Sequence, residues 1–381
     1  MIQGKKQIGW INCAKFFAIL AVLVDHVKGI LYEDETIQYI FFYSVTVFIF
    51  LAGMTAYYSL QNRKKEETGG KWVLRRLGRI LVPYLAAVAV YQYARAGFQL
   101  NLGAYVLWAV NFNLEGQFYY VLIYLQLIAV APVVYLLVMN CRRGKASFLF
   151  RILFLALAWL VSMFLMKHSF ALETYGGGKY LLGGTYDIGC DCNVSGKDYS
   201  TKHVYFVFAA GMLAADLHIS FREKRTAGIA SLGAGVILAA SLGFLLRDRF
   251  AWDESMFGWL LRVNPPGITL MVYSFAVVLF LFAGGSFLIL WNKKGMNRIL
   301  QLMQYIGRYT LYIFLYHTLI LDTFLPRLTF LDHMPGVLKT LVYMAGMLFI
   351  PIAGKVLYDR LKRILREKAA KEENVLQESV E

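Results

Sequence analysis

Long apolar runs alternate with short polar connections along this chain. A run of about twenty apolar residues predicts a membrane-spanning helix, because a helix needs about that length to cross the hydrocarbon core. Open sheets leave backbone groups unsatisfied in lipid, and no alternating barrel pattern occurs, so each run is expected to be helical. Ten runs occur, near 10–31, 38–60, 79–94 (with a continuation through 100–110), 117–139, 148–166, 203–219, 227–246, 268–291, 309–325 and 337–357. The pattern predicts an all-α integral membrane protein with about ten transmembrane helices.

Composition and charge support this interpretation and orient the chain. Hydrophobic residues make up 59% of the sequence and charged residues only 17%, whereas a soluble domain has roughly 25% charged residues. The N-terminus and every second connection hold 27 of the 39 Lys and Arg residues. Because cytoplasmic loops are enriched in these residues, both termini are expected in the cytoplasm. The net charge of +15 then reflects basic clusters facing anionic membrane lipid, and no nucleic-acid partner is expected.

The same pattern suggests one membrane domain with two appended features. Residues 1–358 are expected to form the polytopic domain, and 167–202 its outer loop. Residues 359–381 are expected to form a basic amphipathic tail at the cytoplasmic surface.

The first apolar run contains polar residues that are costly in a membrane. It reads "INCAKFFAILAVLVDHVKGI" and includes Lys15 and His26. The two residues are separated by about 1100° of helix rotation, within about 20° of three full turns, so they share one face about 16 Å apart. A cation near the cytoplasmic entrance and an imidazole further out suit a path that presents an anionic donor to a base. A snorkelling lysine and an interfacial histidine would give the same spacing.

Five blocks of sequence resemble the membrane acyltransferase-3 family. The opening signature of that family has an Arg or Lys followed after ten residues by a His, as in "INCAKFFAILAVLVDH". The chain departs from the family pattern at Asn12, where Asp is frequent, at Lys15, where Arg is commoner, and at Phe118, near which Trp is common. The other four blocks occur in family order: "SVTVFIFLAGMTAYY", "RRLGRILVPYL", "GQFYYVLIYLQLIAVAPVVYLL" and "IGRYTLYIFLYHTLI".

The resemblance implies an enzyme that transfers an acyl group. The expected reaction moves acetyl from cytoplasmic acetyl-CoA to a hydroxyl of a cell-surface polysaccharide or lipid-linked saccharide. The enzyme would be a multi-pass protein of a bacterial plasma membrane, with acyl-CoA as its donor substrate, no tightly bound cofactor and no metal. A multi-span transporter or a glycan exporter without acyl transfer is the alternative, although the sequence lacks internal duplication and paired broken spans.

The resemblance and the chemistry together nominate catalytic residues. His26 is the expected general base, because a positioned histidine can take the proton of a sugar hydroxyl as that hydroxyl attacks a thioester. Asp25 is adjacent in sequence but about 100° around the helix, so a structural or interfacial role is favoured over orientation of His26. His317 is the second candidate, either holding the thioester or relaying protons; an intramembrane His can also simply bond a neighbouring helix.

Five further residues are candidate substrate contacts. Lys15, Asn12 and Arg308 are expected to bind the donor. Glu115 and Gln117 lie at the start of the fourth run, where they could bond the acceptor or occupy solvated loop positions.

Overall fold

The computed structural model of the chain describes residues 2–378, apart from 31, 65, 96–98, 100, 113, 142–146, 170–203, 218 and 251–267. The described residues are helical or irregular, and the β contact among them is an isolated bridge between Lys28 and Tyr32. The prediction of an all-α protein is therefore confirmed for this part of the chain. The chain divides into two compact units, Met1–Arg308 and Tyr309–Glu381.

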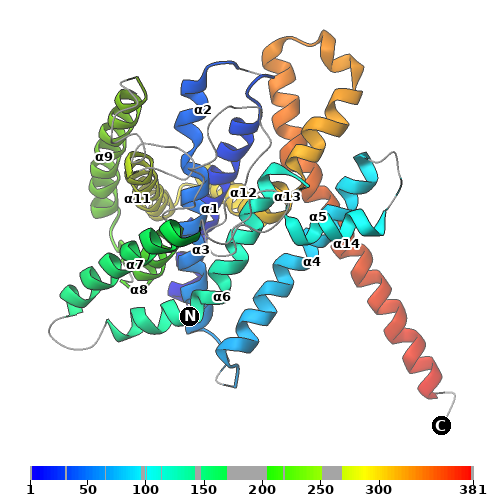
Figure 1. The fold of residues 1–381 in the computed structure, drawn as a ribbon, viewed down its shortest axis with the longest axis horizontal. Helices are drawn as coiled ribbons and strands as arrows, with labels where there is room; N and C mark the ends of the chain where they lie inside the picture. Colours follow the sequence, from blue (N-terminus) through cyan, green and yellow to red (C-terminus); the bar gives the residue numbers. More distant parts are fainter. Residues whose placement is uncertain are drawn as a thin grey trace. The chain divides into compact units, whose positions relative to one another are not determined.

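The first unit contains most of the helices (Figure 1). Its elements are α1 (Ile2–His26), α2 (Glu35–Phe41), α3 (Tyr43–Gln61), α4 (Gly69–Arg95), α5 (Leu102–Asn111), the 3-10 turn η1 (Gly116–Phe118), α6 (Tyr119–Asn140), α7 (Ser147–Ser169), α8 (Val204–Asp216), α9 (Lys224–Phe250), α11 (Ile268–Trp291) and α12 (Lys294–Arg308).

The second unit begins with a helix that changes its winding. Its elements are α13 (Thr310–Leu319), the π-helical turn η2 (Ile320–Phe324), the 3-10 turns η3 (Leu325–Arg327) and η4 (Thr329–His333), and α14 (Gly336–Glu378). Helix α14 contains the last predicted run and residues 359–378 of the predicted tail, so this part of the tail continues the same helix.

Each of the ten predicted apolar runs contains described helix over most of its length, although the first ends at His26 instead of continuing to residue 31. Two further details differ from expectation. The run 309–325 changes from α to π winding at Ile320, and the connection 293–308, expected as a basic loop, is the amphipathic helix α12. From residue 170 onward, the predicted outer loop lies outside the described residues.

Six helical segments in the described part are long and apolar enough to cross a membrane. Three further apolar segments are shorter, at Leu102–Asn111, Ser147–Ser162 and Val204–Asp216, so the number of ten transmembrane helices stays a prediction. The cytoplasmic location of both termini also stays a prediction. The six segments are Gly9–His26, Thr36–Gln61, Gly116–Asn140, Lys224–Arg247, Thr269–Trp291 and Gly336–Lys368.

Helix α3 is central to the packing of the first unit, since it contacts α1, α6, α8 and α11. Its crossing with α8 depends on two reciprocal glycines. A Cβ on Gly53 would clash with the carbonyl oxygen of Phe208, and a Cβ on Gly211 would clash with that of Phe50. Small residues allow this close backbone approach, which drives helix association in lipid through van der Waals packing.

The glycine crossing can be tested by adding one methyl group. We expect Gly53→Ala and Gly211→Ala each to destabilise the protein by about 1–3 kcal/mol, because the clash is with backbone that cannot rotate away. Gly78→Ala is the matched control, since nothing lies within 4 Å of a Cβ at this helical glycine. The measurement is the thermal midpoint for loss of the monodisperse peak in detergent. Equal midpoints for the three variants would contradict the role of the crossing.

The predicted orientation can be tested at exposed positions of the first unit. We expect a membrane-impermeant thiol reagent to label Glu33→Cys from outside intact cells and to label Lys71→Cys only after lysis, because basic connections face the cytoplasm. Both residues are exposed, and the background carries the four native cysteines as alanine. The opposite labelling pattern would place the donor side of the protein outside.

Candidate functional site

A tight loop ends α1 directly after His26. Gly29 has a φ of +81°, in the left-handed region that favours glycine. Its N–H donates to the carbonyl of Tyr32 at 2.9 Å, and this turn brings the Tyr32 side chain back to the helix. The Tyr32 hydroxyl then donates to the carbonyl of Val24 at 2.8 Å, which also accepts from the N–H of Val27 at 3.3 Å, so the end of α1 is bonded to the loop twice at this carbonyl.

The Tyr32 phenol stays protonated in this position. Burial, and secondarily the nearby Asp25 carboxylate, raise the pKa of Tyr32 to about 12. Since a neutral phenol is a hydrogen-bond donor, the bond to Val24 persists across the physiological pH range. The loop therefore holds the last turn of α1, including His26, in a fixed shape.

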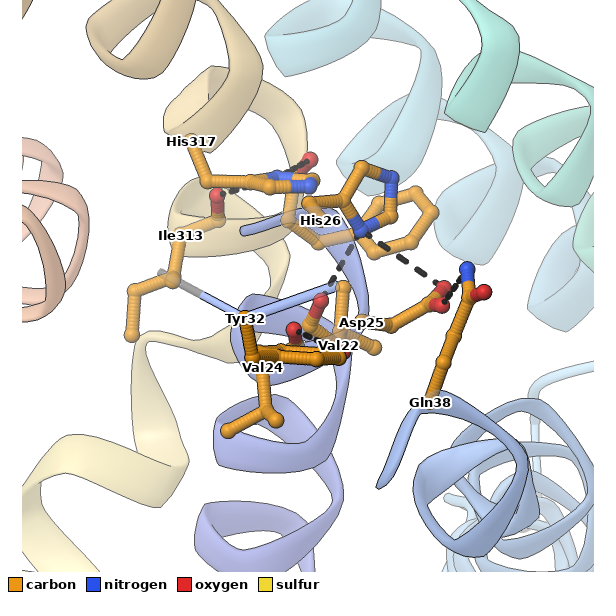
Figure 2. A network of polar contacts seen from close by, with 9 residues as sticks. Val22, Val24, Asp25, His26, Tyr32, Gln38, Ile313 and His317 are labelled. Atoms are coloured by element: carbon orange, nitrogen blue, oxygen red, sulfur yellow. Dashed lines mark hydrogen bonds and ion pairs between the residues drawn. The ribbon is translucent and has the colours of Figure 1, made fainter. Parts of the chain in front are cut away.

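The His26 ring is oriented by the backbone of its own helix (Figure 2). Its Nδ1 lies 2.8 Å from the carbonyl oxygen of Val22. A carbonyl only accepts, so Nδ1 carries the proton and, in the neutral ring, Nε2 carries the lone pair. The side chain is 30% exposed, so it lies at the edge of the packed helices. The geometry presents one basic nitrogen in a defined direction.

The Asp25 carboxylate lies beside the His26 ring. Its Oδ2 is 3.8 Å from Nδ1, too long for a hydrogen bond but within ion-pair distance. Its Oδ1 accepts from Nε2 of Gln38 at 2.8 Å, which connects α1 to α2. The Val22 carbonyl thus orients the ring, while the Asp25 carboxyl group lies beside it and ties α1 to α2.

Lys15 lies on α1, which continues unbroken to His26, so about 16 Å of helix separates the two residues. It is half-buried, and its charge interacts with that of Arg76 on α4. Arg76 is also half-buried, lies over the ring of Trp72 at 5.6 Å, and interacts with Tyr124 on α6. Three helices therefore converge on a pair of like charges.

Within the described ranges, this cation pair has only a longer-range acidic neighbour: the Glu67 carboxylate acts on Arg76 but is itself paired with Arg75. Neither Lys15 nor Arg76 is within ion-pair distance of a carboxylate in the part of the chain that the structure describes. The Nε of Arg76 is buried without a hydrogen-bond partner among those residues. A buried donor that is left unsatisfied is costly, so the arrangement fits an anionic ligand.

Asn12 and Arg308 lie at a second close helix crossing. A Cβ on Gly307 would clash with the carbonyl oxygen of Asn12, so α1 and α12 touch backbone to backbone. The Asn12 side chain is half-buried and Arg308 is exposed. The structure therefore brings these two predicted donor residues to one crossing, and Asn12 is about one helical turn from Lys15 on α1.

Glu115 and Gln117 belong to a buried polar group rather than a solvated loop. Both side chains are buried, so the alternative of solvated loop positions is wrong. Glu115 forms an ion pair with Arg95, the last residue of α4. Gln117 donates from Nε2 to the Tyr91 hydroxyl at 3.1 Å. The turn η1 and the end of α4 together form this group.

His317 lies in the second unit. It is fully buried on α13, and its Nδ1 donates to the carbonyls of Phe314 at 2.8 Å and Ile313 at 3.2 Å; Figure 2 draws the contact with Ile313. The same argument assigns the lone pair to Nε2. The π-helical turn η2 begins three residues later, a feature frequently found at functional sites.

Sequence reasoning missed Arg76 because it lies in a basic cluster typical of a membrane-flanking loop. A signal was present in the helical period. The inward face of α4 has buried residues at Trp72, Ile80 and Tyr84, and Arg76 lies midway between the first two, in register with them. Its neighbours Arg75 and Arg79 are exposed. Arg95 and Gln38 had no comparable signal, since their partners lie on other elements.

Comparison with known proteins agrees with the blocks of sequence described above. The sequence model of the acyltransferase-3 family, described as an acyltransferase domain, matches residues 8–356. No match was found among curated proteins or among solved structures. The match includes every candidate site residue, and the helices long enough to cross a membrane agree with it. This chain therefore belongs to the acyltransferase-3 family and is a membrane acyltransferase.

Proposed function

We propose that the protein transfers an acetyl group from cytoplasmic acetyl-CoA to a hydroxyl of a cell-surface polysaccharide or lipid-linked saccharide. The observation that carries this proposal is the His26 ring. Its protonated Nδ1 donates to Val22 and leaves Nε2 as a base, on the same helix as Lys15. The proposed location is a bacterial plasma membrane, with acetyl-CoA as a substrate rather than a resident cofactor.

The proposed reaction needs one group that first takes and then returns a proton. Nε2 of His26 removes the proton of the acceptor hydroxyl as its oxygen attacks the thioester carbonyl. The carbon–sulfur bond of the resulting tetrahedral intermediate then breaks, and the imidazolium gives its proton to the leaving thiolate. The products are an O-acetyl ester and the free thiol of CoA. Asp25, 3.8 Å from the ring, stabilises the imidazolium between the two steps.

The donor phosphates are assigned to the cation pair. Lys15 and Arg76 are half-buried like charges without a carboxylate partner in the described part, and phosphates are anions that Arg binds through its planar fork and Lys as a point charge. Asn12 and Arg308 lie at the adjacent crossing of α1 and α12, where they can contact the rest of CoA. His317, in the second unit, stays a separate candidate for holding the donor thioester or relaying protons.

The acceptor is assigned to Glu115 and Gln117. A saccharide presents hydroxyls that both donate and accept, and Glu115 and Gln117 offer an acceptor and an amide beside the phenol of Tyr91. Arg95 pairs with Glu115. An ionised carboxylate accepts hydrogen bonds only, so it would bind hydroxyl donors of the sugar.

Replacement of the base should abolish transfer without unfolding the protein. We expect His26→Ala to lower ester formation by about 10²–10⁴-fold, the usual contribution of a positioned base. His26→Gln should fail nearly as badly, because its amide can donate to Val22 but cannot take a proton. The measurement is acetyl transfer to glycan in membranes with matched amounts of each variant. Near-native activity of His26→Gln would move the base to another residue.

The matched control separates chemistry from export of the glycan. In cells with His26→Gln, the glycan should reach the surface in normal amount but without acetyl esters, as measured by mass spectrometry. Loss of the polymer itself would favour the glycan exporter over the acyltransferase reaction proposed here.

Removal of charge from the cation pair should weaken use of the donor. We expect Lys15→Met and Arg76→Gln each to raise the KM for acetyl-CoA by about tenfold or more, since a hydrogen bond to a charged group contributes about 1.5–3 kcal/mol. Lys15→Arg should retain most activity because the charge survives. Arg75→Gln is the matched control, since Arg75 is exposed and already paired with Glu67. An unchanged KM in both variants would make the pair structural.

A further inference from the structure

A cavity opens along α9 and α11, and its lining includes none of the residues assigned to acyl transfer. Its volume is about 700 Å³, which is within the range of sites that hold small molecules. The lining comes from the first turns of α9 and one aromatic ring of α11. The main lining residues are Lys224, Arg225, Gly228, Ile229, Leu232 and Phe287.

The lining is amphipathic along the axis of α9. Lys224 and Arg225 stand at the beginning of the helix, and the apolar wall of Gly228, Leu232 and Phe287 follows. Gly228 keeps the wall open, because a Cβ there would lie 3.3 Å from the Phe287 ring. A ligand that fits this order has an anionic group at one end and an apolar chain at the other.

The same end of the helix pair carries an excess of positive charge. Arg222 precedes α9, and Lys293 and Lys294 follow α11, all three exposed. Glu223 is the acidic residue in these two short segments. The positive potential at the cavity mouth therefore exceeds what Lys224 and Arg225 supply, which favours an anion over a neutral or zwitterionic group.

A tryptophan places this end of the cavity at the depth of lipid headgroups. Lys224 and Lys293 lie over the ring of Trp291 at 5.4 and 4.7 Å. Tryptophan is enriched at the membrane–water interface, and lysine extends toward the headgroups there. The outward side of α9 is apolar, with Ile229 and Leu232 largely exposed, so the cavity opens toward the lipid chains.

We propose that this cavity binds an anionic glycerophospholipid of the leaflet that its basic residues face. The phosphate contacts Lys224 and Arg225, and one acyl chain lies along Gly228 and Phe287. The basic connections predict that this leaflet is the cytoplasmic one, whose anionic lipids attract such clusters. Lipid binding here does not depend on the proposed acetyl transfer, and it would hold α9 against α11, two helices in extensive contact.

The test is photolabelling of the full-length protein in nanodiscs. The probe is phosphatidylglycerol with a diazirine on one acyl chain, in a phosphatidylcholine bilayer, and the comparison is phosphatidylcholine with the same chain. We expect the anionic probe to label peptides of α9 and α11 selectively. Lys224→Gln combined with Arg225→Gln should lower that labelling about tenfold or more, because each basic residue near an anionic surface contributes about 1 kcal/mol.

Two matched controls separate this site from general charge and packing effects. Lys362→Gln with Arg363→Gln removes an equivalent exposed pair on α14, where Lys362 also lies over an aromatic ring, Tyr358. This variant should keep full labelling of α9 and α11. Gly228→Leu should fill the cavity and block labelling, whereas Gly233→Leu, with nothing within 4 Å of its Cβ, should not.

The outcomes distinguish the lipid site from its alternatives. Equal labelling by the two probes, or labelling unchanged in the Lys224 and Arg225 double variant, would overturn the proposal. Displacement of the probe by a polyprenyl phosphate but not by unlabelled phosphatidylglycerol would also overturn it and indicate a lipid-linked saccharide instead. Labelling in the His26→Gln background should be unchanged, so failure of the catalytic proposal and failure of the lipid site give different results.

Discussion

The close crossing of α3 and α8 is the constraint on which the first unit depends. In lipid, apolar side chains gain little by leaving their surroundings, so helices associate through close packing and hydrogen bonds. Gly53 and Gly211 allow the two backbones to touch, and α3 in turn packs against α1, α6 and α11. The two glycines therefore help to set the position of α3, and through it the position of α1, which carries Lys15 and His26.

The polar residues of the first unit fall into two groups by how they are neutralised. Asp216 on α8 accepts from the Tyr57 hydroxyl at 2.9 Å and pairs with Arg151 at 3.3 Å, and Glu115 pairs with Arg95. These pairs stabilise buried charge within the protein, as buried ions require. Lys15 and Arg76 instead repel each other. The repulsion is the physical reason to expect a ligand there, because a bound anion would offset it.

Sequence periodicity predicted the helices well and their partners poorly. Each apolar run is helical over most of its described length, because a membrane leaves no other way to satisfy backbone groups. The shared helix of Lys15 and His26 followed from spacing alone. Burial of Glu115 and the contact of Gln38 with Asp25 did not, because each depends on which element lies opposite. The inward register of Arg76 was present in the helical period of α4 but was hidden by the basic cluster around it. The count of Lys and Arg likewise predicted a loop at residues 293–308, where the structure has α12. An amphipathic helix at the membrane surface is as rich in basic residues as a loop, so charge alone does not distinguish the two.

Local hydrogen bonding alone does not choose between His26 and His317 as the base. In both residues Nδ1 donates to a main-chain carbonyl of the preceding turn, so both leave Nε2 as the basic nitrogen. Their surroundings differ. His26 is 30% exposed and has the Asp25 carboxylate at 3.8 Å, whereas the His317 side chain is fully buried on α13. An acceptor hydroxyl must reach the base, and the base must become a cation during the reaction. Access and a neighbouring carboxyl group therefore favour His26, and they leave His317 better suited to hold a thioester in an apolar environment.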